Sequence, residues 1–178
     1  MRANSVVYTS IKVKEVFGLF KKLFNFTQHT VYIRFKNEKV HFSFFPEEIH
    51  YTELPLIALN KTSKKPKVTA VGEAVKELPP EDPSVVYAPF EPFEPEVHFD
   101  LAEKTLRTLM QKEGVLRGAL IAPRIVIHPD KSTLSETERQ AYEELGLSIG
   151  GREVVVHVGE SLNDVIIYKL FKHKNTSK

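Results

Sequence analysis

Residues 123–162 decide the fold, and they read PRIVIHPDKSTLSETERQAYEELGLSIGGREVVVHVGESL. Residues 124–128 and 153–158 are nearly continuous apolar runs, which is typical of strands buried on both faces of a sheet. Between them, Ser135 begins a helical pattern with Glu138 at the capping-box position. Because two parallel strands need a crossover connection of about this length, the segment predicts neighbouring parallel strands joined by a helix.

Upstream of this unit, short segments rich in β-branched and aromatic residues predict further strands. Residues 30–35 (TVYIRF) and 39–44 (KVHFSF) read as a hairpin, residues 56–60 (LIALN) as a third strand, and residues 68–72 (VTAVG) as a fourth candidate. Three antiparallel strands followed by two crossover-connected strands predict an α/β fold with a mixed five-stranded sheet. This is the ribonuclease H-like arrangement.

A proline-rich segment separates the two groups of strands. Residues 79–95 hold six of the eleven prolines, so we expect an extended connector rather than a packed element. Its PFEPFEPE repeat also suits a protein ligand, although a stiff crossing between lobes is the preferred interpretation. Asp100 is the predicted N-cap of the next helix, with Glu103 at the capping-box position. The expected buried stripe of that helix is Leu101, Leu106, Leu109 and Met110. The last predicted helix covers residues 161–171.

Composition excludes several classes of function. The chain has 178 residues, no cysteine and a formal net charge of +2. Without cysteine there is no disulfide, thiolate zinc site or cysteine nucleophile. Acidic residues are interspersed with the basic ones, so we expect no nucleic acid partner. No histidine pair has the helical spacing of a zinc site, and we expect neither a metal nor another cofactor. No apolar run is long enough to span a bilayer, and we expect a cytoplasmic protein.

Residues 11–24, IKVKEVFGLFKKLF, predict a short basic amphipathic helix within an N-terminal segment of residues 1–26. Two interpretations stay open: docking on an anionic membrane or a partner, and packing against its own domain, which is somewhat favoured. Membrane affinity would be modest, since each basic residue adds roughly 1 kcal/mol near an anionic surface. The docking residues would be Phe17, Phe20, Lys21, Lys22 and Leu23. Residues 173–178 are a predicted disordered tail.

Four collinear segments carry a resemblance to a known family: residues 18–35, 55–78, 97–112 and 123–162. Together they resemble MreB, the family of bacterial actin homologues that determine rod shape as cytoskeletal ATPases. The resemblance implies the first half of an actin-like fold over residues 27–172. It also implies a small inserted lobe at about residues 61–95.

The resemblance fails at the phosphate site. Actin-like ATPases open with a D-x-G-T motif, in which the aspartate helps to hold the metal and the glycine lets the backbone approach the phosphates. Here Phe24 stands in place of the aspartate and Phe26 in place of the glycine. Thr27 and Thr30 persist, although Thr30 is as well explained as an ordinary strand residue. The family also continues into a second half with another phosphate loop, whereas this sequence ends at Lys178. We therefore expect no tight nucleotide binding.

One catalytic position of the family is matched. Glu138 corresponds to the glutamate that helps to position the attacking water, but its role as a helix cap is the preferred interpretation. We expect the chain not to be an enzyme. It would instead be a non-catalytic interaction or scaffold protein linked to cell shape or the bacterial cytoskeleton, which binds another protein or itself.

Two enzymatic alternatives stay open. A metal-dependent hydrolase or nuclease on a ribonuclease H-like sheet would need Glu38, Asp130 and Glu138 to converge on a metal. A residual nucleotide-binding ATPase is the other alternative. A triad of Ser132, His128 and Asp130 is disfavoured because no nucleophile-elbow pattern surrounds the serine. His128 and His157 are expected on adjacent strands, as half-buried sheet residues.

Overall fold

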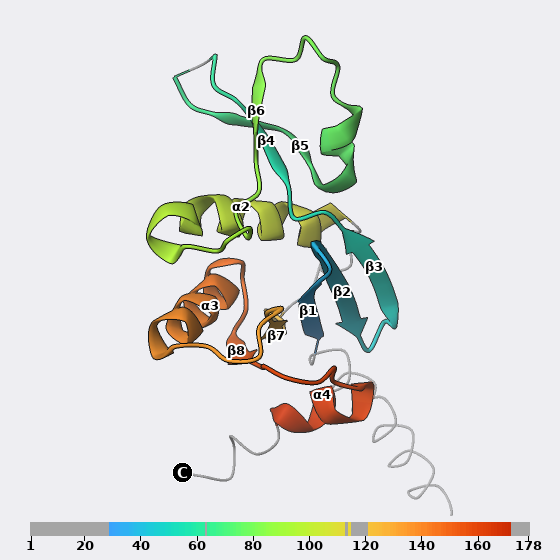
Figure 1. Cartoon of the computed structure of the whole chain (residues 1–178). Helices are drawn as coiled ribbons and strands as arrows, with labels where there is room; N and C mark the ends of the chain where they lie inside the picture. The colour runs from blue at the N-terminus through green and yellow to red at the C-terminus, as the bar shows by residue number, and fades with distance from the viewer. Residues whose placement is uncertain (1–28, 63, 113, 115–120, 172–178) are drawn as a thin grey trace, which may run out of the picture.

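The computed structural model describes residues 29–62, 64–112, 114 and 121–171. Figure 1 shows a small sheet at one end of the molecule, helix α2 beneath it, and a larger sheet with α3 and α4 at the other end. Residues 11–24 and 173–178, for which a helix and a tail were predicted, lie outside the described residues. Within the described part of the chain, no helix is long and apolar enough to cross a membrane.

The larger sheet has the mixed five-stranded topology that the sequence predicted. Its strand order is β3-β2-β1-β7-β8, with antiparallel pairing from β3 to β1 and parallel pairing from β1 to β8. The strands are β1 (Thr30–Lys36), β2 (Lys39–Phe45), β3 (Ile49–Glu53), β7 (Arg124–His128) and β8 (Glu153–Val156).

The third strand of this sheet is β3, and not residues 56–60 as predicted. β3 reads IHYTE and lies at the sheet edge, where most of its side chains are exposed. An exposed edge strand carries little of the apolar pattern that identifies strands in a sequence. The predicted residues 56–60 instead contain β4 (Ile57–Asn60), which belongs to a different sheet.

The small sheet has the strand order β5-β4-β6, and both neighbours of β4 are antiparallel to it. Its other elements are β5 (Lys67–Val71), the short 3-10 helix η1 (Gly72–Glu77) and β6 (Ser84–Tyr87). β6 corrects the prediction that residues 79–95 form an unpacked connector. The run SVVY is long enough for an edge strand, a position that tolerates flanking prolines.

Side chains of the same proline-rich segment also enter the core. Phe93 is buried and lies 4.9 Å from the ring of Tyr142, and Phe90 lies 4.7 Å from the ring of Phe35. The segment therefore packs against the large sheet and α3 rather than passing over them.

Helix α2 (Pro95–Lys112) begins earlier than predicted. Proline is favoured in the first helical turn because its missing N–H group would be unpaired there and its φ angle suits the helix. Asp100 is an exposed residue inside the helix, so its predicted N-cap role is wrong. The predicted stripe is buried at Leu106, Leu109 and Met110, while Leu101 is only partly buried.

Helix α3 (Glu136–Ser148) has the predicted capping box. The Ser135 hydroxyl accepts the Glu138 N–H, and the Glu138 carboxylate accepts the Ser135 N–H. Gly146 lies within the helix, facing β8. A Cβ at that position would be 2.6 Å from Val154 Cγ1, so the glycine permits the helix to approach the sheet closely.

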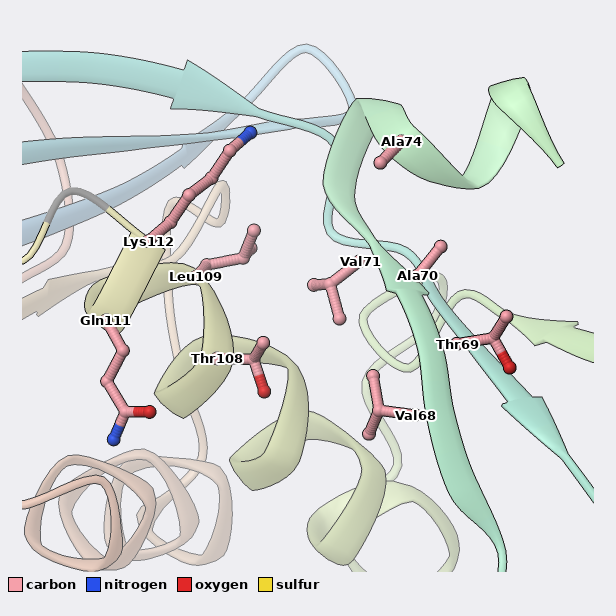
Figure 2. A pocket seen from close by; sticks show the side chains of 9 residues that line it. All are labelled: Val68, Thr69, Ala70, Val71, Ala74, Thr108, Leu109, Gln111 and Lys112. Atoms are coloured by element: carbon pink, nitrogen blue, oxygen red, sulfur yellow. The ribbon is translucent and has the colours of Figure 1, made fainter.

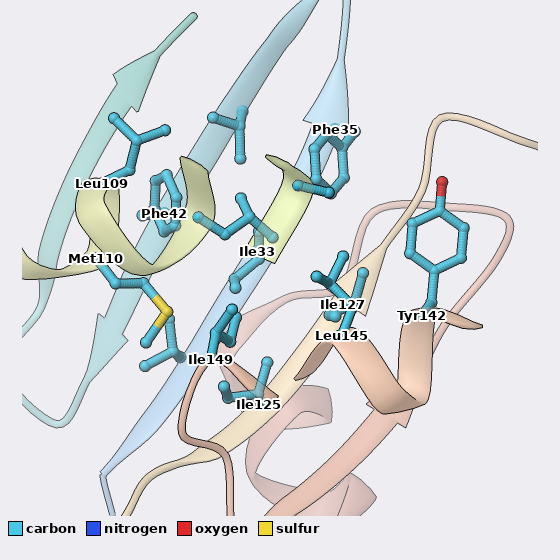
Figure 3. Close-up of a cluster of buried hydrophobic side chains, with 14 of the residues drawn as sticks. Ile33, Phe35, Phe42, Leu109, Met110, Ile125, Ile127, Tyr142, Leu145 and Ile149 are labelled. Atoms are coloured by element: carbon cyan, nitrogen blue, oxygen red, sulfur yellow. The ribbon is translucent and has the colours of Figure 1, made fainter. Parts of the chain in front are cut away.

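The two faces of the large sheet are covered differently. Figure 3 shows the main core, where Leu109 of α2 and Leu145 of α3 pack over Ile33, Ile125 and Ile127. Full burial of each such side chain stabilises the fold by about 1.5–3 kcal/mol. The opposite face is covered by α4 (Asp164–Leu170), which is shorter than the predicted helix of residues 161–171. The core on that face contains Tyr32, Phe45, Val126, Ile167 and Phe171.

Candidate functional site

The carboxyl ends of β1, β7 and β8 meet at one edge of the large sheet, because these three strands are parallel. Ligands of open α/β sheets bind beyond the carboxyl ends of the strands. A cavity of about 350 Å³ lies at this edge. It is lined by Arg34, Phe35, His128, Pro129, Asp130, Lys131, Ser132 and Gly159.

The turn between β1 and β2 lies at the same edge. Asn37 and Glu38 both have positive φ angles, 53° and 59°, and the flanking Lys36 and Lys39 are paired. Two-residue hairpin turns with positive φ angles usually contain glycine, which this turn lacks. The Asn37 N–H donates to Asp130 Oδ2 over 3.2 Å, so the turn is tied to the segment that follows β7.

Thr30 is the only named residue of the degenerate phosphate motif that the structure describes, and it does not lie at this edge. Thr30 is the first residue of β1 and is paired with Arg124, the first residue of β7. It is buried and lies at the amino end of the strands, opposite the cavity. Phe24, Phe26 and Thr27 lie outside the described residues.

His128 is held by hydrogen bonds at both ring nitrogens. Its Nε2–H donates to the Gly159 carbonyl over 3.1 Å, so Nδ1 accepts from the Tyr32 hydroxyl over 2.6 Å. Burial lowers the pKa of His128, and the neighbouring His157 lowers it further. These bonds are those of a neutral, structural histidine.

His128 and His157 were expected as half-buried residues of adjacent strands. His128 ends β7 but is buried, and His157 lies just after β8 and is partly buried. Their ring centroids are 4.8 Å apart. His157 donates its Nε2–H to the Glu160 carbonyl over 2.9 Å. The two rings therefore hold the loop that connects β8 to α4. Because both nitrogens of His128 are bonded to Tyr32 and Gly159, this histidine does not form a triad with Ser132 and Asp130.

Glu138 acts as a capping residue in this structure. Besides its bonds to Ser135, its carboxylate accepts from Lys131 Nζ over 2.5 Å. The Lys131 hydrogen bond, followed by the backbone and hydroxyl bonds of Ser135, lowers the pKa of Glu138 to about 2. A carboxylate with so low a pKa is a weak base, which argues against a role in activating water.

The three carboxylates that a metal-dependent enzyme would need do not all come together, although Glu38 and Asp130 line one hollow. Across residues 29–62, 64–112 and 121–171, no group of three or more histidine, aspartate or glutamate side chains is placed to hold a metal ion. Asp130 is bonded to the turn after β1 and Glu138 to Lys131.

A second hollow of about 440 Å³ lies between β5 and α2 (Figure 2). Val68 and Val71 line it from the small sheet, and Thr108, Leu109 and Lys112 line it from the helix. This groove was not predicted from the sequence, because its two walls are about forty residues apart along the chain.

Glu53 closes one end of this region, where β3, η1 and α2 meet. Its buried carboxylate accepts the Glu73 N–H over 2.9 Å and forms an ion pair with Lys112. Gly72 packs against it with a φ angle of +73°, and a Cβ there would be 2.2 Å from Glu53 Oε2. The carboxylate therefore joins the small sheet to the larger one.

Comparisons with known proteins support the fold. No protein-family model matches the sequence, and no curated protein matches it. Among solved structures, MreB5 of Spiroplasma citri bound to ADP is similar with a TM-score of 0.56 and 16% identity, covering 75% of this chain and 39% of that chain. The same protein bound to AMPPNP is similar with a TM-score of 0.54 and 17% identity, covering 74% and 39%.

The chain therefore has an actin-like α/β fold with a mixed five-stranded sheet, which confirms the predicted fold class. It spans 39% of the length of these structural neighbours. The more specific prediction, membership of the MreB family, stays a prediction.

Proposed function

We propose that this chain is a non-catalytic, MreB-like domain that acts by binding protein partners, including itself, within or beside a bacterial cytoskeleton. Its structural similarity to MreB5 supports a cytoskeletal relationship. We place this role in the cytoplasm. Docking of residues 11–24 on a membrane surface or partner, through Phe17, Phe20, Lys21, Lys22 and Leu23, stays the alternative to their packing against the domain itself.

The turn after β1 carries the argument for a lost nucleotide function. Backbone N–H groups bind phosphate when they are free and converge on it, usually with glycine beside them. Here the Asn37 N–H is already bonded to Asp130, and the next residue of the turn is Glu38. Both carboxylates disfavour an anionic ligand at this position.

Residual nucleotide binding is a second candidate, because the 350 Å³ cavity at this edge also contains Arg34, Lys131 and Ser132. Basic side chains and a hydroxyl are groups that bind phosphate. Lys131 is, however, paired with Glu138, which reduces the positive charge it offers.

Isothermal titration of the full chain with Mg-ATP separates the two candidates. We expect no saturable heat, because the turn amide is occupied and acidic groups flank it. Micromolar binding that is weakened by Arg34→Ala, but not by the control Arg107→Ala on the exposed side of α2, would establish residual nucleotide binding instead.

A further inference from the structure

The small sheet has two open edges of different character. In the described residues, β5 and β6 each pair only with β4, so each presents unpaired backbone groups along its outer side. The first three residues of β5 are exposed, and Val85 and Val86 of β6 are 45% and 49% exposed. Open strands with exposed valines are suited to pairing with another strand.

The two edges carry opposite charges. Residues 64–71, which are β5 and the residues just before it, include three lysines and neither aspartate nor glutamate. Lys64 and Lys67 are exposed at the beginning of β5. On the other edge, Glu81 and Asp82 precede β6, and Asp82 Oδ1 accepts the Ser84 N–H over 2.8 Å.

The register places these charges at the same end of the sheet. Asn60 of β4 lies opposite Lys67 on one side and opposite Ser84 on the other. Since both outer strands are antiparallel to β4, they run parallel to each other and begin at this end. The basic and acidic segments are therefore level with each other, on opposite edges.

We propose that a second copy of this chain binds along β5 with its own β6, in parallel, and extends the small sheet from one molecule to the next. This inference rests on the proposed binding role and names the partner. In that arrangement Glu81 of the second copy lies level with Lys64, and Lys67 lies level with Ser84, two residues from Asp82. Main-chain hydrogen bonds hold the strands together and the charges select the pair.

The groove between β5 and α2 provides the apolar part of the contact. Val68 and Val85 both lie opposite the buried Leu59, so their side chains share the sheet face that is turned toward α2. A β6 strand added beside β5 would place its Val85 next to Val68, above Thr108 and Leu109. Val68, Thr108 and Leu109 line the 440 Å³ groove (Figure 2).

A head-to-tail contact fits these edges better than a two-fold one. Pairing β5 with β5, or β6 with β6, would bring edges of the same charge together. Pro66 and the irregularity between Ala58 and Leu59 of the β4–β5 pair limit pairing near the beginning of β5. The lysines there favour an acidic strand over a basic one. Sheet twist would turn successive copies by roughly 60–75°, about 20–25° for each of three strands, which separates their larger domains.

Sedimentation velocity of the full chain over a range of concentrations tests the contact with two variants. Lys64→Glu/Lys67→Glu changes the β5 edge, and Glu81→Lys/Val85→Lys changes the β6 edge. Wild type should associate with rising concentration, and each variant alone should show a dissociation constant raised about tenfold or more. An equimolar mixture should regain association, because one unaltered β6 and one unaltered β5 can still pair. Two-fold pairing would not give this pattern.

Val97→Lys/Lys104→Glu, which changes an exposed valine and an exposed lysine of α2, is the control and should associate like wild type. Circular dichroism would verify that each variant is folded. A wild type that is monomeric at every concentration, a variant that associates like wild type, or a mixture that regains nothing would overturn the proposal. None of these results would alter the titration with Mg-ATP, so the proposed loss of nucleotide binding is judged separately.

Discussion

Glu53 shows how one side chain can join two parts of the chain. It ends β3, accepts the Glu73 N–H of η1 and pairs with Lys112 at the end of α2. A buried carboxylate is costly unless it is paired and hydrogen-bonded, and here it is both. The position of the small sheet relative to α2 therefore depends on this residue.

Glu53→Gln should destabilise the protein by about 1–3 kcal/mol, since it removes the charge that Lys112 and the Glu73 N–H both contact. Urea denaturation would measure the change in the free energy of unfolding. Glu103→Gln is the matched control, because Glu103 pairs with Arg107 at the surface of α2, where such pairs contribute about 0.3–0.5 kcal/mol. Equal effects of the two substitutions would contradict the role given to Glu53.

Gly72→Ala should destabilise more than Gly150→Ala, by about 1–3 kcal/mol. Both glycines have positive φ angles, +73° and +109°, so both substitutions introduce backbone strain. Only at Gly72 would the new Cβ also meet the Glu53 carboxylate, whereas nothing lies within 4 Å at Gly150. Comparing the thermal unfolding of the two variants isolates the effect of the contact between the new Cβ and Glu53. A similar loss of stability in both variants would show that the Glu53 side chain moves away at little cost.

Single contacts between distant residues were the least predictable features. The Asn37–Asp130 bond joins positions 93 residues apart, and the Glu53–Lys112 pair joins positions 59 apart. Local sequence patterns carry no information on such pairs. The capping box of Ser135 and Glu138 was predictable because both partners lie within one turn.

Among the elements, α3 offers a test by pH. The pKa of Glu138, about 2, is below the ordinary glutamate value of about 4.3. A depressed pKa in the folded state contributes stability that is present above the unfolded value and is lost as pH falls toward 2. Glu138→Gln keeps the capping hydrogen bond and removes the charge. The free energy of unfolding of this variant should therefore fall less than that of wild type between about pH 5 and pH 2.

Chemical denaturation at several pH values, followed by circular dichroism, measures this difference. Glu143→Gln, an exposed position in the middle of α3, serves as the control and should follow wild type. Identical pH dependence of wild type and Glu138→Gln would show that Lys131 does not stabilise the carboxylate in solution.

Elements were predictable from the sequence to the extent that they are buried. β7 and β8 were predictable from their apolar runs, and α3 was predictable from its capping box and its helical period. β3 and β6 were missed because both are short edge strands with exposed side chains. The start of α2 was misplaced because Asp100 resembles an N-cap, while Pro95 is the residue that begins the helix.

At the scale of the whole molecule, the actin-like sheet was predictable and the candidate site was only partly so. The order of the elements determines which strands end at the cavity edge. The resemblance, however, aligned the phosphate motif with residues 24–30, at and before the beginning of β1. In the structure, the turn that lies at this edge follows β1 and contains Asn37 and Glu38. The motif was therefore aligned with residues that come before the strand, whereas the turn at the cavity edge comes after it.

The claim that this edge does not bind nucleotide is tested most directly by NMR titration of the ¹⁵N-labelled full chain with Mg-ATP. The amide signals of Asn37, Lys131 and Gly159 report on the turn and on the cavity that adjoins it. We expect that these signals do not shift in a saturable manner, because the Asn37 N–H is already bonded to Asp130. Saturable shifts confined to these residues and their neighbours would contradict it.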